Sequence, residues 1–280
     1  MQDTERSGKV REMLDVRASI RTDPGCLRGS NEDHGRHVSP GDHDTIARRG
    51  RLTVIADGMG GHSSGEVASR MAVEIITHRY YSDKGRASYE VLRRAIEEAN
   101  REIYDASSAD ESLAGMGTTV VALVMIADRA FSAHVGDSRL YRMNGGRLEL
   151  LTRDHSQVMD MVQQGLITAE QARSHDEKNV ILRALGPQAE VEVELSDVFA
   201  VERGDTFLLC SDGLNDMVED GEIEAILRSE PDEHQAADLL IAAAKENGGH
   251  DNVTVGIIKV VAARAAPPQQ VPITREIEVS

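Results

Sequence analysis

Residues 52–58 read Leu-Thr-Val-Ile-Ala-Asp-Gly, and residues 206–213 read Thr-Phe-Leu-Leu-Cys-Ser-Asp-Gly, so in both stretches an apolar strand runs directly into Asp-Gly. A third stretch, Gly-Gly-His-Asp-Asn at 248–252, stands immediately before an apolar strand. Each pattern places a carboxylate at the end of a buried strand, where a sheet holds its position. Carboxylates gathered in a protein interior repel one another unless a cation offsets their charge. Together with Glu32 and Asp33, these aspartates predict a site for a hard divalent cation bound through oxygen.

The composition limits the classes of protein to which the chain can belong. The chain has 280 residues, which suffice for one large domain or two small ones with a sizeable core. Its formal net charge of −17 argues against a nucleic-acid partner, because phosphate backbones are bound by basic faces. No stretch approaches the roughly 20 apolar residues of a membrane span, and the N-terminus lacks a signal-peptide pattern. We therefore expect a cytoplasmic protein without a membrane span.

The chain has two cysteines, Cys26 and Cys210. Their number and positions predict two reduced thiols in an intracellular protein. A catalytic thiol sits in an electropositive pocket. Cys210 is followed instead by Ser-Asp, and no arginine closes a phosphate-binding loop behind it. Cysteine catalysis is therefore excluded.

The spacing of apolar residues predicts the elements of the fold. Strands are expected at residues 16–22, 52–57, 118–127, 130–135, 139–143, 147–151, 190–200, 204–210 and 252–261, two successive amphipathic helices between 63 and 103, and a helical stretch over 222–247. Short strands joined by hairpins indicate antiparallel sheets, and helices that come in pairs disfavour a doubly wound parallel sheet. We predict an α+β fold, a four-layer α/β/β/α sandwich of two mostly antiparallel sheets flanked by helix pairs.

Composition also marks the boundaries. Residues 1–14 are polar and charged, and they are expected to be a mobile N-terminal lead-in. Residues 15–262 are expected to form a single domain, in which 29–51 is a loop by composition. Residues 152–186 are polar and locally helical, so we expect an inserted flap there. The segment 263–280 has no core pattern and is expected to be a flexible tail.

The Gly-rich turn at residues 57–62, Asp-Gly-Met-Gly-Gly-His, has several interpretations. A single Asp-Gly pair is most often an ordinary turn. A dinucleotide-binding turn needs glycine where Ser63 stands, and a nucleoside-triphosphate loop needs a Gly-Lys-Ser/Thr that is missing. Both nucleotide interpretations therefore fail. The recurrence of strand-linked aspartates favours a metal site over a plain turn.

Arg28 lies four residues before Glu32 and five before Asp33. In isolation this charge cluster is typical of a solvated loop. Beside a metal site the guanidinium becomes a candidate phosphate clamp, because its planar fork matches two phosphate oxygens. The residues alone leave both interpretations open.

Six motifs occur along the chain. They are Asp23-x-Gly25-x-x-Arg28-x-x-Asn31-Glu32-Asp33, Asp57-Gly-Met-Gly-Gly-His62, Gly117-Thr-Thr119, Gly136-Asp-Ser-Arg139, Ser211-Asp-Gly213 and Asp251-Asn-Val-Thr254. Taken together and in this order, they resemble the metal-dependent serine/threonine protein phosphatases of type 2C in their bacterial form. The resemblance covers residues 16–261 and implies a single phosphatase domain, 15–262, with the metal site at one edge of the sandwich.

The resemblance also implies a set of metal ligands. Two divalent cations, Mn²⁺ or Mg²⁺, are expected, with Asp57 as the bridge between them. Asp212 and Asp251 are then expected to complete the shell of one cation, and Glu32 with the Gly58 carbonyl to serve the other. In bacterial relatives an aspartate at the position of Asp137 joins the Asp212 equivalent to hold a third, weaker metal.

The chemistry that the resemblance implies is attack by water on phosphorus, in line and without a covalent phosphoenzyme. The site's cations bring the pKa of that water towards neutrality. Arg28 is expected to hold the phosphate oxygens, and His62 to protonate the leaving serine or threonine oxygen. Asp33 is expected to orient the attacking water. Asn252 is expected to fix its loop by hydrogen bonds, and Gly117-Thr118-Thr119 to shape the sheet near the site.

The expected function is therefore that of a monomeric phosphatase that removes phosphate from phosphoserine and phosphothreonine on proteins. It would oppose a bacterial serine/threonine kinase. Two alternatives stay open: a phosphatase dedicated to one regulatory protein, of the anti-sigma antagonist type, and a non-catalytic regulator on the same fold. The second alternative requires a lost ligand, and the sequence shows no such loss at the principal positions.

Overall fold

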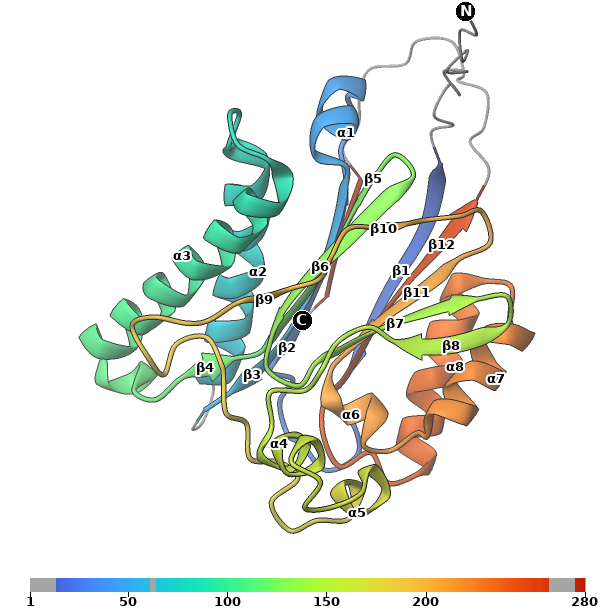
Figure 1. Ribbon diagram of the computed structural model, residues 1–280. Helices are drawn as coiled ribbons and strands as arrows, with labels where there is room; N and C mark the ends of the chain where they lie inside the picture. Colours follow the sequence, from blue (N-terminus) through green and yellow to red (C-terminus); the bar gives the residue numbers. More distant parts are fainter. Residues whose placement is uncertain (1–13, 61–63, 262–274, 280) are drawn as a thin grey trace, which may run out of the picture.

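The computed structural model of the protein describes residues 14–60, 64–261 and 275–279. Two sheets face each other, and a helix pair covers the outer face of each (Figure 1). Helices α2 (Ser64–Ser82) and α3 (Ser88–Ala109) lie on one side, and α7 (Asp220–Ser229) and α8 (Glu233–Glu246) on the other. The predicted α+β fold, with four layers and antiparallel sheets, is confirmed.

The first sheet has five strands in the order β1-β12-β11-β7-β8. Their bounds are Asp15–Asp23 for β1, Val253–Val261 for β12, Thr206–Cys210 for β11, Arg139–Asn144 for β7 and Arg147–Leu150 for β8. All its pairings are antiparallel. Since β12 pairs with both β1 and β11, the chain segments that carry Asp212 and Asp251 emerge at the same edge.

The second sheet follows the order β10-β6-β5-β3-β2-β13, with β4 paired to β3 and β9 paired to β6. The bounds are Phe199–Ala200 for β10, Arg129–Val135 for β6, Val120–Ile126 for β5, Arg51–Met59 for β3, Asp33–Ser39 for β2, Arg275–Val279 for β13, Gly117–Thr118 for β4 and Glu194–Leu195 for β9. These pairings are antiparallel as well.

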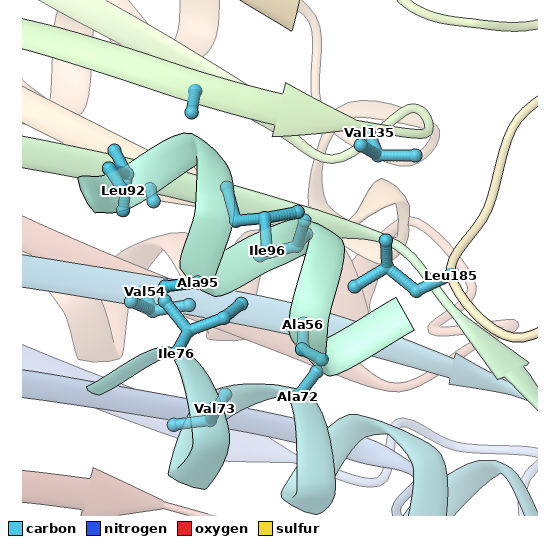
Figure 2. Close-up of a cluster of buried hydrophobic side chains, with 14 of the residues drawn as sticks. Val54, Ala56, Ala72, Val73, Ile76, Leu92, Ala95, Ile96, Val135 and Leu185 are labelled. Carbon is cyan, nitrogen blue, oxygen red and sulfur yellow. The ribbon is translucent and has the colours of Figure 1, made fainter. Parts of the chain in front are cut away.

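Apolar side chains from both sheets meet in the middle of the sandwich. Ile55 and Leu123 from one sheet belong to the same buried cluster as Leu209 and Ile258 from the other. A second buried cluster joins the inner faces of α2 and α3 to the outer face of the second sheet (Figure 2). Burying apolar area on both faces of a sheet stabilises it and fixes the direction in which its strand ends point.

Shorter elements complete the chain. They are α1 (His43–Arg49), the 3₁₀ turn η1 (Glu111–Leu113), α4 (Gln157–Gln163), α5 (Ala169–Arg173) and α6 (Asp212–Asn215). Helices α4 and α5 lie at the end of the sandwich where α6 lies (Figure 1), within residues 152–186, for which we use the name flap. Leu185, just before the end of the flap, is fully buried against the α2–α3 layer (Figure 2).

The loop predicted over 29–51 is wrong, because this stretch contains β2 and α1. Strand β2 is rich in polar residues, yet it is mostly buried between β3 and β13. Burial lowers the pKa of His37 in this strand to about 4, so the ring is buried without a charge. Its Nδ1 also has a hydrogen-bond partner, Thr53 Oγ1, at 2.8 Å. Helix α1 could have been predicted from its N-cap residue, Asp42, whose side chain accepts the Thr45 N–H at 2.8 Å.

Three further expectations need correction. The helical stretch at 222–247 is two helices, broken around Pro231, because proline disfavours helix in the residue before it. The strand expected at 190–200 is two short pieces, β9 and β10. The tail expected at 263–280 is wrong for 275–279, which add β13 to the edge of β2 through backbone pairing that needs no core pattern. Of the lead-in 1–14, only Leu14 is within the described residues.

Candidate metal centre

Strands β2 and β3 bring Asp33 and Asp57 opposite each other at one edge of the second sheet. Hydrogen bonds hold both backbone groups of Asp57, its N–H and its C=O. Its N–H donates to Thr119 Oγ1 at 3.1 Å, and its C=O accepts from the Thr119 N–H at 2.9 Å and from Thr118 Oγ1 at 2.8 Å. The two threonines therefore shape the sheet around Asp57, as the sequence predicts for this motif.

Helix α2 begins directly against Glu32 and Gly58. The Gly58 N–H donates to the Glu32 carbonyl at 3.1 Å, and that carbonyl also accepts from Ser69 Oγ at 2.5 Å. A Cβ at Gly58 would lie 2.2 Å from the Gly65 carbonyl oxygen, so a larger residue does not fit. A Cβ at Gly65 would in turn lie 2.5 Å from Glu32 Oε2. The first turn of α2, whose dipole favours negative charge, thus sets the position of the Glu32 carboxylate.

The first sheet contributes Asp212 and Asp251 at the same edge of the sandwich. Asp212 is the first residue of α6, directly after β11, and Asp251 stands two residues before β12. The Ser211 N–H donates to the Thr254 carbonyl at 3.1 Å, which joins the two segments beyond the end of β11. Both Asp212 and Asp251 are half-buried.

A hydrogen-bonded chain links the two sheets at this edge. Ser211 Oγ donates to Asp33 Oδ2 at 2.7 Å and accepts the Thr254 N–H at 2.9 Å. Asp33 thus belongs to one sheet while its carboxylate is held by the other. Ser211 belongs to one of the six motifs, but its role was not predicted. A hydroxyl beside a candidate ligand is too common to indicate by itself which group it would bind.

Asn252 fastens the loop that carries Arg28. Its Oδ1 accepts the Glu32 N–H at 2.8 Å, and its Nδ2 donates to the carbonyls of Pro24 and Ser30 at 3.1 and 2.9 Å. One side chain therefore satisfies three backbone groups across the β1–β2 loop. The sequence predicts that Asn252 fixes its own loop, and its side-chain hydrogen bonds join that loop to the β1–β2 loop.

Arg28 reaches the site, where it pairs with a carboxylate. Its guanidinium Nη2 lies 2.7 Å from Asp251 Oδ2, so the candidate phosphate clamp pairs with a candidate metal ligand. The side chains of Arg28 and Asp251 are 55% and 39% exposed. An ion pair with this much water around it contributes only about 0–1 kcal/mol. Arg28 can therefore exchange Asp251 for another anion at little cost.

Asp137, in the turn between β6 and β7, is buried and interacts with two further carboxylates. Asp154 and Asp216 both raise its pKa, which burial and these neighbours bring to about 7. Asp154 is itself held by the guanidinium of Arg139, with Nε and Nη2 contacts of 2.9 and 2.6 Å. Asp216 could be found by spacing, because it lies four residues after Asp212, on the same side of a helical turn.

The carboxylates perturb one another strongly. Loss of water on burial, together with neighbouring carboxylates, raises the pKa of Asp57 and of Asp212 well above the usual range. Burial also raises the pKa of Asp33 to about 6, although hydrogen bonds from Thr254 and Ser211 oppose the shift. Groups that resist ionisation to this extent destabilise the folded chain at neutral pH unless a cation is bound beside them.

Two buried oxygens indicate where such cations fit. Oδ1 of Asp33 and Oδ1 of Asp137 have no hydrogen-bond partner among the residues that the structure describes. Buried polar atoms without a partner are rare in folded proteins and call for a missing ligand. The donor set around them consists of carboxylate and carbonyl oxygens, which hard cations such as Mg²⁺ and Mn²⁺ prefer. The residues therefore fit a divalent-metal centre.

Nearly all the residues predicted for the site come together at this edge. They are Arg28, Glu32, Asp33, Asp57, Gly58, Asp137, Asp212, Asp251 and Asn252. The candidate general acid, His62, lies outside the described residues. The structure thus joins segments separated by more than 200 positions in the chain, as the pair of Arg28 and Asp251 shows.

A family model described as Protein phosphatase 2C matches residues 42–239. The chain belongs to the protein phosphatase 2C family. The resemblance that the six motifs suggest is therefore confirmed. The matched range contains Asp57, Asp137 and Asp212.

Relatives of this phosphatase 2C chain are bacterial. It is 40% identical over 250 residues to the "Serine/threonine phosphatase stp" of Listeria monocytogenes, covering 87% of this chain and 96% of that protein. It is 36% identical over 253 residues to the "Serine/threonine protein phosphatase PstP" of Mycobacterium tuberculosis, covering 90% of this chain and 46% of that protein. A crystal structure of the PstP catalytic domain "in complex with 2 Manganese ions" has a TM-score of 0.76 at 36% identity, covering 89% and 99% of the two chains.

The close approach of α2 to β3 gives a first prediction for this family member. Gly58→Ala would push a Cβ to 2.2 Å from the Gly65 carbonyl, so backbone must move. We expect the free energy of unfolding to fall by about 2 kcal/mol or more, as is typical of an overpacked interior, in urea denaturation. Gly85→Ala is the matched control, because no atom lies within 4 Å of its Cβ. Equal stability of the two variants would contradict the packing described for Glu32 and α2.

The raised pKa values give a second prediction, for protein treated with a chelator. The folded chain keeps a proton on Asp137 up to about pH 7, whereas an unfolded aspartate loses it near pH 4. Between these values the folded state binds more protons, so this group makes stability fall as pH rises. We therefore expect Asp137→Asn to be more stable than the parent protein. The difference between their free energies of unfolding should grow from about pH 4 to about pH 7.

The comparison with Asp137→Asn isolates this contribution. Burial lowers the pKa of His34 and His37 to about 4, and these histidines drive the opposite trend over the same range. Their contribution is common to both proteins and cancels in the difference. Thermal unfolding across pH measures the effect, and added Mn²⁺ is expected to reverse the order of stability. A difference that shrinks with rising pH would refute the electrostatic description of this turn.

Proposed function

We propose that the protein is a metal-dependent phosphatase that hydrolyses phosphoserine and phosphothreonine on proteins by direct attack of water. The observation that carries this proposal is the group of carboxylates with raised pKa values at one edge of the sandwich, next to Arg28. Two of them have a buried oxygen with no hydrogen-bond partner among the described residues. Membership of the protein phosphatase 2C family and the names of the relatives support it.

The ligand assignment follows the two sheets. Burial raises the pKa of Asp57, and the carboxylates of Asp33, Asp212, Asp137 and Asp251 raise it further. This interaction with carboxylates of both sheets supports Asp57 as the bridge between two cations. Asp212 and Asp251 would complete the shell of one cation, and Glu32 with the Gly58 carbonyl would serve the other. Asp137 would bind a third, weaker ion together with Asp212.

Bound Mn²⁺ or Mg²⁺ supplies positive charge for the phosphate oxygens and lowers the pKa of water towards neutrality. The chain's own residues then bind and orient the reactants. Arg28, freed from Asp251, binds two phosphate oxygens through its planar fork. Asp33 has Oδ2 occupied by Ser211, so its Oδ1 is the atom that can accept a hydrogen bond from the attacking water and orient it. His62 would donate a proton to the leaving serine or threonine oxygen.

A covalent route through cysteine is not supported. Burial raises the pKa of the Cys210 thiol to about 12, so it stays protonated at neutral pH and is a poor nucleophile. Cys26 is exposed, and its thiol donates to the Lys245 carbonyl at 3.8 Å rather than facing the carboxylates. Both thiols are free, in agreement with the prediction of two unpaired cysteines.

The biological setting completes the proposal. The protein would act as a monomer in the cytoplasm, on the substrates of a cognate serine/threonine kinase. The names of the bacterial relatives, which are serine/threonine phosphatases, support the class of substrate in this proposal. None of the helices in the described residues has the length and apolar character to cross a bilayer.

The activity itself is the third prediction. Hydrolysis of p-nitrophenyl phosphate and of phosphothreonine peptides is expected to require Mn²⁺ or Mg²⁺ and to stop with a chelator. Asp57→Asn removes the bridging charge, so we expect its kcat to fall by about 100-fold or more. Asp105→Asn, an exposed change on the outer helix α3, is the matched control and should keep full activity. Metal-independent turnover, or an active Asp57→Asn protein, would contradict the proposal.

The fourth prediction separates phosphate binding from metal binding. Arg28→Ala is expected to raise KM for a phosphopeptide by roughly tenfold or more, because a charge-assisted contact to phosphate is lost. Arg28→Lys should recover only part of this loss, since it keeps the charge without the fork. Mn²⁺ affinity, measured by calorimetry, should not weaken in either variant. Arg101→Ala, on the exposed side of α3, is the control. A matching loss of Mn²⁺ affinity would show that Arg28 supports the metal site instead.

A further inference from the structure

Three side chains form a separate polar cluster under the flap, beside the β6–β7 turn. His134 comes from β6, His155 from the start of the flap and Glu194 from β9. The two imidazole rings stack at 4.6 Å between centroids, with 17° between their planes. His155 Nε2 lies 3.0 Å from Glu194 Oε2. Both histidines are buried, while Glu194 is partly exposed.

The hydrogen bonds show that this cluster is not a metal site. His155 Nδ1 accepts the Gly136 N–H at 3.1 Å, so in the neutral ring the proton lies on Nε2 and is donated to Glu194. His134 Nε2 faces the Arg153 carbonyl at 2.8 Å and is therefore also a donor. A shared metal would have to lie in the plane of both rings, and stacked rings cannot direct their lone pairs at one ion. The cluster is a hydrogen-bonded network of two imidazole rings, the Glu194 carboxylate and backbone groups.

One residue, His155, binds both backbone groups of Gly136. Its ring Nδ1 accepts the Gly136 N–H, and its own N–H donates to the Gly136 carbonyl at 2.9 Å. Gly136 has a φ of +107°, and a Cβ there would lie 2.6 Å from Thr119 Cγ2. The turn is therefore pressed against the threonine that fixes the backbone of Asp57. Asp137, whose Oδ1 has no hydrogen-bond partner in the part of the chain that the structure describes, is the next residue.

His155 is in turn held from two other directions. Glu194 fixes the proton on Nε2, which leaves Nδ1 as the acceptor. The Leu182 N–H donates to the His155 carbonyl at 2.8 Å, so the two ends of the flap meet at this residue. The buried ring thus has a fixed tautomer and orientation before any ligand binds. A substitution of His155 would therefore affect Asp137, because a single peptide unit joins Gly136 to Asp137.

We propose that His155 is a positioning residue, whose neutral Nδ1 holds the Gly136 N–H and so fixes the carboxylate of Asp137 towards the metal centre. The inference rests on the proposed function only for what Asp137 binds. The hydrogen bond from Gly136 is a property of the chain without metal. It assigns a task to a histidine that touches neither phosphate nor cation.

A pair of isosteric variants tests this role. His155→Asn places an amide oxygen near the position of Nδ1, whereas His155→Leu has the same branching without an acceptor. We expect amide hydrogen exchange at Gly136, measured by NMR without metal, to accelerate about tenfold in His155→Leu, as for one lost hydrogen bond. His155→Asn should restore most of the protection. His78→Leu, on the exposed side of α2, is the control and should change nothing.

Metal binding and activity supply the second readout. The Mn²⁺ concentration for half-maximal activity should rise about tenfold in His155→Leu and recover in His155→Asn. Equal behaviour of the two variants in exchange and in Mn²⁺ dependence would overturn the proposal. A parent protein without phosphatase activity would refute the proposed function, whereas the exchange data would still decide the role of His155.

The parent protein provides a test that needs no variant to fold. Correlation of the ring nitrogens with the ring protons by ¹⁵N NMR should show His155 as a neutral ring with the proton on Nε2 and a bare Nδ1. This signature is expected to persist when metal is removed. A proton on Nδ1 would overturn the inference outright, because that nitrogen could then not accept from Gly136.

Discussion

Repulsion among carboxylates at one edge of the sandwich is the constraint on which the rest of this structure depends. Asp33, Asp57, Asp137, Asp212 and Asp251 each gain a raised pKa or raise that of a neighbour. Without bound cations, bringing these carboxylates together costs free energy, because burial and like charge both oppose their ionisation. The surrounding framework must therefore hold them in place at a cost to stability that bound cations offset.

That framework works mainly through backbone groups. The Thr118–Thr119 pair fixes Asp57, the first turn of α2 fixes Glu32, and His155 binds both polar groups of Gly136. Ser211 ties the carboxylate of Asp33 to the opposite sheet. Rigid contacts of this kind keep each carboxylate at a set position, which a metal centre requires because its affinity depends on ligands being placed in advance. The two sheets and their apolar core supply the stiffness behind these contacts.

Local patterns in the sequence predict much of the fold. Alternating and continuous apolar runs identify most strands, and the two-helix stretch after residue 63 appears as α2 and α3. The failures have physical causes. Strand β2 is polar and buried, so its composition resembles a loop, and β13 is held by edge pairing that leaves no pattern in the side chains. Asp154 and His155 lack an informative neighbourhood in sequence, because their partners lie on other elements.

The sequence by itself determined the family, the ligand types and a short set of aspartates, because strand-linked Asp-Gly motifs are local and occur in a fixed order. Only the tertiary structure decided how these groups interact. It pairs Arg28 with Asp251 across more than 200 residues, and it places Asp154 and Asp216 beside Asp137. The reason is that pKa shifts and hydrogen-bond partners depend on distance in space and on exclusion of water. Neither quantity can be read from positions along a chain.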